Sequence, residues 1–138
     1  MTEKDLDEIL MRPRKCRDNL ARCNEELRNA RLKAESNGAI RYDKDRIISS
    51  ASDEGMVNKV QAILDAEANV DLAEAELKEA IVEADKVISL IDDDSIRNVI
   101  RGYYVDMYSC RQIGYIMMYS PRTIRRLKEK GIGILKRC

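Results

Sequence analysis

Residues 109–127 read SCRQIGYIMMYSPRTIRRL, and this stretch contains the start signals of two helices. Ser109 lies three residues before Gln112, the spacing of a capping box, in which each side chain bonds the backbone N–H of the other residue. Further along, Ser120 precedes Pro121, and proline is favoured at the first position of a helix because the N–H there has no helical partner. The stretch therefore predicts two short helices separated by a tight turn.

The apolar residues of this stretch are spaced so that the two helices can cross over a shared core. With Met118 and Tyr119 as the turn, small Gly114 lies where the helices come closest, and the inward set is Ile113, Met117, Tyr119, Ile124 and Leu127. At about 100° per residue, Ile124 and Leu127 share one side of the second helix, and the opposite side carries Arg122, Arg125, Arg126 and Glu129. This is the pattern of a helix-turn-helix, whose second helix enters the DNA major groove.

The predicted DNA-binding residues come from both helices. Arginine supplies the charge that attracts phosphates and the paired donors that fit a guanine edge. We expect the recognition face to be Arg122, Arg125 and Arg126, with Lys128 and Lys130 as phosphate contacts. The full predicted set is Ser109, Arg111, Ser120, Arg122, Thr123, Arg125, Arg126, Lys128 and Lys130.

Charge is divided unevenly along the chain. The 138 residues carry 25 Lys and Arg against 25 Asp and Glu, a net charge of zero. Residues 1–94 hold 15 basic and 23 acidic side chains, a net charge of −8, whereas residues 95–138 hold 10 and 2, a net charge of +8. A basic module joined to an acidic scaffold is typical of a nucleic-acid-binding protein.

The composition predicts an all-α fold, because helix-forming charged and apolar residues dominate and the chain has only 6 Gly and 2 Pro. We expect two long helices at about residues 5–36 and 54–91. A linker over residues 37–53 would join them, because Asn37 and Gly38 form a helix stop signal.

Both long helices carry an apolar stripe. In the first, the stripe has the three- and four-residue spacing of a coiled-coil seam: Leu6, Ile9, Pro13, Cys16, Leu20, Cys23, Leu27, Ala30 and Ala34. Pro13 predicts a kink, or a helix that begins there. In the second helix, Glu67 and Glu74 interrupt the stripe. We therefore expect the helices to pack along each other, and part of the first stripe to face another subunit of a homodimer or higher homo-oligomer.

These patterns divide the chain into two regions. Residues 1–91 form a helical hairpin and coiled-coil oligomerisation region, and residues 92–138 form a trihelical DNA-binding domain. An aspartate among residues 92–94 would cap the first helix of that domain, at about residues 95–104. The side chains that would cover the two following helices are Ile96, Val99, Ile100 and Tyr103.

A known family shares this arrangement of residues. The matching positions are Tyr103, Tyr104, Ser109, Ile113, Tyr119, Ser120 and the run Arg122 to Arg126, with a looser match at Asp45 to Ser50 and the acidic helix after it. They resemble sigma-factor region four and, more closely, small prophage proteins of Gram-positive bacteria grouped with RinA-like and ArpU-like late transcription regulators. The chain departs from that pattern at Met118, where the family has a turn glycine, and at Gly131 and Gly133, where alanine is expected. The resemblance implies a phage or prophage transcription regulator that binds specific duplex DNA sequences.

Other chemistry is not indicated. The chain has no His, and Cys16, Cys23, Cys110 and Cys138 lack paired-ligand spacing, so we expect no metal, no cofactor and no catalytic residue. The acidic N-terminus lacks the apolar segment of a signal peptide, and no apolar run approaches the roughly 20 residues of a membrane span. We therefore expect a cytoplasmic protein that is not an enzyme.

Two alternative functions fit the same features. A phage terminase small subunit, which packages DNA, can also join a helix-turn-helix to a coiled coil, and a ring-shaped oligomer would favour it. The basic domain could instead bind RNA polymerase or a sigma factor, because sigma region four also contacts polymerase. Negligible DNA affinity at physiological salt, with retained polymerase binding, would favour that role.

Overall fold

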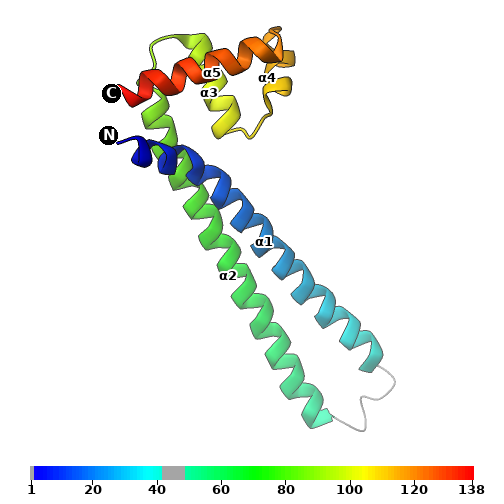
Figure 1. The fold of residues 1–138 in the computed structure, drawn as a ribbon. Helices are drawn as coiled ribbons and strands as arrows, with labels where there is room; N and C mark the ends of the chain where they lie inside the picture. The colour runs from blue at the N-terminus through cyan, green and yellow to red at the C-terminus, as the bar shows by residue number, and fades with distance from the viewer. Residues whose placement is uncertain (1, 42–48) are drawn as a thin grey trace. The chain divides into compact units, whose positions relative to one another are not determined.

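The computed structural model describes residues 2–41 and 49–138, and the side chains of residues 2–35 and 55–138. Within these ranges the chain forms helices and no strand, which confirms the predicted all-α fold. The helices are α1 (Glu3–Arg41), α2 (Ser49–Ile88), α3 (Asp94–Tyr104), α4 (Cys110–Met117) and α5 (Pro121–Lys136). Two long helices are followed by three short ones, as the sequence predicts (Figure 1).

The two long helices have different bounds from those predicted. The expected stop at residues 37 and 38 is wrong, because α1 continues to Arg41; a glycine costs a helix about 1 kcal/mol but does not prevent it. The expected helix start at Pro13 is also wrong, because α1 runs through it. α2 begins at Ser49 and ends at Ile88. Residues 42–48 of the predicted linker, and most of the family match over residues 45–50, lie outside the described residues.

The contacts of the chain group it into two compact units. Unit 1 comprises residues 1–17 and 76–138, and therefore contains the start of α1, the end of α2 and the three short helices. Unit 2 comprises residues 18–75, where the remainder of α1 meets the remainder of α2. The expected domains, 1–91 and 92–138, divide the chain at another position, and that division stays a prediction.

Unit 2 is held together by a seam in which α2 contributes small residues. Cys23 and Leu27 of α1 pack against Ala66, Val70 and Ala73 of α2. The prediction that Glu67 and Glu74 interrupt the stripe of α2 is wrong. The seam is continued by the preceding residues, Ala66 and Ala73, which are buried against α1. Small side chains let the two backbones approach closely while the larger α1 side chains fill the space between them.

The glutamates of α2 lie beside the seam of unit 2, at its edge or in solvent. Glu67 is half-buried and its Oε1 is 3.2 Å from Nη2 of Arg31, whereas Glu74 is exposed. Every residue of the predicted α1 stripe is buried or half-buried within this one chain. The contact of this stripe with another subunit stays a prediction. The large apolar residues that unit 2 leaves exposed include Val57, Val60, Leu64 and Leu72 of α2.

Unit 1 has two buried clusters, and α3 contributes to both. In the first, Leu6 and Leu10 of α1 meet the end of α2, Ile96 and Ile100 of α3, and Leu135 of α5. In the second, Val99 of α3 packs against one isoleucine from each of the last two helices. α3 therefore contributes side chains from one face to both clusters, and Leu127 of α5 packs against both.

Polar contacts join the start of α1 to the rest of unit 1. Arg12 Nη1 lies 2.8 Å from Glu83 Oε2, and Arg17 Nη2 donates to the carbonyl oxygen of Val105 at 2.8 Å. The Glu83 hydrogen bond raises the pKa of the Arg12 guanidinium, so this group stays charged. At the far end of α5, Lys136 Nζ lies 2.7 Å from Glu3 Oε1.

Candidate nucleic-acid interface

Both predicted helix starts are present in the α4–α5 pair. Ser109 Oγ accepts the N–H of Gln112 at 3.1 Å, and Gln112 Oε1 accepts the N–H of Ser109 at 2.9 Å, which confirms the capping box. Ser120 Oγ accepts the N–H of Thr123 at 3.2 Å, and Pro121 is the first residue of α5. α3 is capped in the same way, because Asp93 accepts the N–H of Ile96. These caps depend on residues three positions apart, so the sequence alone could reveal them.

The turn between α4 and α5 is tight and uses a left-handed residue. Met118 ends α4 with φ 62° and ψ 38°, and its side chain is 91% exposed. A Cβ at Gly114 would lie 2.6 Å from the carbonyl oxygen of Tyr119. Real Cβ atoms do not approach so closely, so residue 114 must be glycine for this turn to close. The prediction that Gly114 lies at the closest approach of the helices agrees with this geometry.

The core beneath the pair contains most of the predicted inward set. Ile113 and Ile124 are buried against Val99 of α3, with Met117 and Leu127 beside them. Tyr119 is the exception: its side chain is 45% exposed, so the prediction that it faces inward is wrong. The residue lies in the turn before the Ser120 cap, outside both helices, and borders a surface hollow together with Tyr115, Pro121 and others.

The outer face of α5 carries exposed cations. Its side chains Arg122, Arg125, Arg126 and Lys130 are exposed, as is Arg111 at the start of α4. Within the described residues, none of these five forms an ion pair. Their charges therefore remain available to an anionic ligand. Arg137, which the sequence reading left out, is exposed beyond the last turn of the same helix.

Lys128 differs from the other predicted cations. It is half-buried, and its Nζ lies 3.8 Å from the ring centroid of Tyr103. Arg14 of α1 also approaches this ring, with Cζ at 5.4 Å. Tyr103 packs edge-to-face on Tyr104, and burial raises the pKa of the Tyr104 phenol. The tyrosine pair thus lies at the rim of the core, and Tyr103 orients Lys128 by a cation–π contact.

The hydroxyl side chains of the predicted set are used in helix capping. Ser109 and Ser120 are exposed N-caps, and Thr123 is half-buried with its Oγ1 2.9 Å from Ser120 Oγ. Their oxygens are therefore partly satisfied before any ligand binds. Both caps lie at the positive ends of helix dipoles, where backbone N–H groups favour an anion.

α5 remains a continuous helix through both of its glycines. It runs from Pro121 to Lys136 without a break, so the two departures from the family pattern do not shorten it. Gly131 is buried, and a Cβ there would lie 2.8 Å from Ile96 Cγ2 and 2.8 Å from Ile100 Cγ1. Glycine at this position thus lets α5 approach α3 closely enough to fix the direction of its arginine face.

Comparison of the chain with protein-family models, with curated proteins and with solved structures finds no match. Within the described residues, no three His, Cys, Asp or Glu side chains converge in a way that could hold a metal ion. None of the helices among those residues has the length and apolar character that crossing a membrane requires.

Proposed function

We propose that the α4–α5 pair is a helix-turn-helix and that this protein binds specific sequences in double-stranded DNA, as a phage or prophage transcription regulator. The observation that carries the proposal is the outer face of α5. Arg122, Arg125 and Arg126 are exposed there and have no ion-pair partner among the described residues, whereas Ile124 of the same helix is buried. A capped helix with cations on one face and its other face packed on a support is suited to the major groove.

The cations divide into two proposed roles. Arg122, Arg125 and Arg126 lie in the first half of α5, where a recognition helix reaches base edges, and each guanidinium can donate two hydrogen bonds to a guanine. Lys130 lies further along and would contact phosphate, while Arg111 and the Ser109 cap on α4 would meet the adjacent backbone. Lys128 contributes charge from a fixed position, because Tyr103 holds its ammonium group.

Selection of random double-stranded DNA with the purified full-length protein tests the proposal. A defined sequence should be enriched, and its affinity should fall steeply with salt because phosphate contacts release counterions. Arg122→Ala or Arg126→Ala should weaken binding to the selected site by about 1–3 kcal/mol and should relax the sequence specificity at one base pair. Lys130→Ala should weaken all sequences alike and lower the salt slope by about one.

The matched control is Arg22→Ala. Arg22 is an exposed arginine of unit 2, hydrogen-bonded only to Asn19 in the described contacts, and its replacement should leave DNA affinity unchanged. The proposal is wrong if no sequence is enriched, or if a triple alanine variant at 122, 125 and 126 keeps the affinity of the wild type.

A homodimer or higher oligomer belongs to the same proposal, because a small three-helix domain commonly needs a second half-site for useful affinity. The residues of the α1 stripe are buried or half-buried, so the exposed apolar residues of α2, among them Leu64 and Leu72, are the better interface. Sedimentation equilibrium should show an oligomer that Leu64→Asp with Leu72→Asp dissociates. A wild-type protein that stays monomeric at tens of micromolar would refute the proposed oligomer. A ring-shaped oligomer would favour the terminase-like alternative.

A further inference from the structure

The exposed side of α4 is apolar. Tyr115 is 89% exposed, Met118 91% and Ile116 61%, and Tyr108 and Tyr119 extend the same surface at its two ends. We call these five residues the α4 patch. Soluble proteins rarely leave such a contiguous apolar surface in water unless it binds something.

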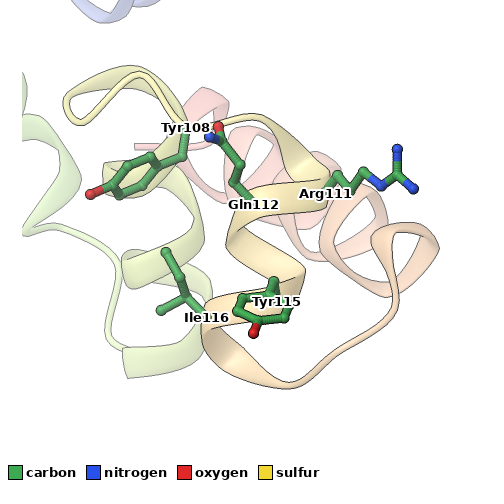
Figure 2. A pocket seen from close by; sticks show the side chains of 5 residues that line it. All are labelled: Tyr108, Arg111, Gln112, Tyr115 and Ile116. Carbon is green, nitrogen blue, oxygen red and sulfur yellow. The ribbon is translucent and has the colours of Figure 1, made fainter.

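The α4 patch contains two adjoining hollows. The first is lined by Tyr108, Arg111, Gln112, Tyr115 and Ile116. Figure 2 shows Tyr108 and Ile116 bordering this hollow from two elements, while Arg111 extends away from them beyond the opposite edge of α4. The second is lined by Arg111, Gly114, Tyr115, Met118, Tyr119 and Pro121. Arg111 and Tyr115, one helical turn apart, thus form a ridge between the two hollows.

The chemistry of the two hollows suits a protein better than DNA. Duplex DNA attracts surfaces rich in Lys and Arg, whereas Arg111 is the one charged side chain that lines either hollow. Apolar side chains with a single cation are instead the make-up of a groove that takes an amphipathic helix. Three of the proposed DNA-binding arginines, Arg122, Arg125 and Arg126, lie on a different helix, α5, and Arg111 is proposed only as a contact to the DNA backbone.

We propose that the α4 patch binds an acidic amphipathic helix of a partner protein. Two large apolar side chains, one turn apart, would enter the two hollows and straddle the Arg111–Tyr115 ridge, as ridges and grooves of packed helices do. An Asp or Glu between them would pair with the Arg111 guanidinium, which has no ion-pair partner in the described part of the chain.

Charge decides the kind of partner. Residues 95–138 carry a net charge of +8, so an acidic helix is attracted and a basic one is repelled. The same patch of a second copy would bring one Arg111 toward another, which disfavours self-association here. This binding goes beyond DNA recognition and shares only Arg111 with it, so Tyr115→Ala and Ile116→Asp test it separately from the DNA proposal.

A displayed library of helical peptides, selected on the full-length protein and counter-selected on Ile116→Asp, tests the inference. The side chain of Ile116 is largely exposed, so this variant should fold, which circular dichroism checks. Enriched peptides should carry an acid between two large apolar residues. Binding of a synthetic copy, followed by fluorescence anisotropy, should weaken about tenfold or more in Tyr115→Ala, Arg111→Ala and Ile116→Asp.

Val82→Asp is the matched control, because Val82 of α2 is also exposed in unit 1 but lies outside both hollows. It should bind the peptide as the wild type does. The inference is overturned if no peptide is enriched, if enriched peptides are basic, or if they bind Ile116→Asp equally well. DNA affinity of Ile116→Asp is measured alongside, and its loss without peptide enrichment would assign the patch to DNA instead.

Discussion

Gly131 of α5 lies directly against Ile100 of α3, so closely that a Cβ at residue 131 would be 2.8 Å from Ile100 Cγ1. Gly131→Ala should therefore destabilise the protein by about 1–3 kcal/mol. The added methyl group would push α5 away from α3, and the loss of packing should exceed the gain of about 1 kcal/mol in helix propensity. Gly133→Ala is the matched control: its Cβ would meet only Arg137 Nη2, at 3.7 Å. That variant should be more stable than the wild type by up to about 1 kcal/mol. Urea unfolding followed by circular dichroism distinguishes the two, and equal effects would contradict the close contact.

Met118→Gly should stabilise the protein. Met118 adopts a left-handed conformation that costs a residue with a Cβ about 1–2 kcal/mol, and its exposed side chain contributes little packing. Part of that gain is lost because glycine adds entropy to the unfolded chain, so we expect a net increase of about 0.5–1 kcal/mol. Met118→Ala keeps the Cβ and should not stabilise. Thermal unfolding of the three proteins makes the comparison, and stabilisation by alanine would refute this explanation.

Ala73→Leu should destabilise unit 2 by about 1–3 kcal/mol, because Ala73 is 2% exposed in the seam between α1 and α2 and the larger side chain cannot fit. Ala75, two residues away, is exposed, and Ala75→Leu should stay within about 0.5 kcal/mol of the wild type. Denaturant unfolding measures both. A neutral Ala73→Leu would mean that the alanine face does not form the contact with α1.

The Glu3–Lys136 ion pair should make stability depend weakly on pH. A hydrogen bond and the charge of Lys136 lower the pKa of the Glu3 carboxyl, and the same contact raises the pKa of the Lys136 ammonium. The Glu3 contribution is present above the ordinary carboxyl pKa and is lost as pH falls through the lowered one. The Lys136 contribution is present below the ordinary ammonium pKa and is lost as pH rises through the raised one.

Glu3→Gln should therefore lower the Tm at neutral pH and low salt, and the difference from wild type should vanish in acid or in high salt, because both groups are exposed and screened. Glu8→Gln is the control, since Glu8 is exposed and forms no ion pair with another described residue. An undiminished difference at high salt would show that the effect is not electrostatic.

Features of the α4–α5 pair that depend on neighbours in sequence could be predicted. The Ser109–Gln112 box and the Ser120–Pro121 start were expected from residues within one helical turn of each other, and so was the exposure of the three arginines of α5. Such features follow from helix geometry, which sets what lies three or four positions away.

Features that depend on distant partners could not be predicted. The sequence reading placed Lys128 among the phosphate contacts, yet Tyr103 from another helix occupies one side of its ammonium group. The sequence also predicts that Glu67 interrupts the α2 stripe, because a charged side chain does not suit a helix seam. The buried residue at this level is the neighbouring Ala66. Alanine suits either the surface or a close helix contact, and only the position of α1 decides between them.

The sequence by itself determined that this chain is helical, where its short helices begin, and that its charge is concentrated near its C-terminal end, because composition and caps act within a few residues. The tertiary structure alone decided that the α1 stripe is covered within the same chain, that Gly131 is a contact and not a helix end, and that Tyr119 faces solvent. Each of these outcomes depends on which helices pack against each other. The spacing of apolar residues within one helix shows which face is buried, but it does not show which helix covers that face.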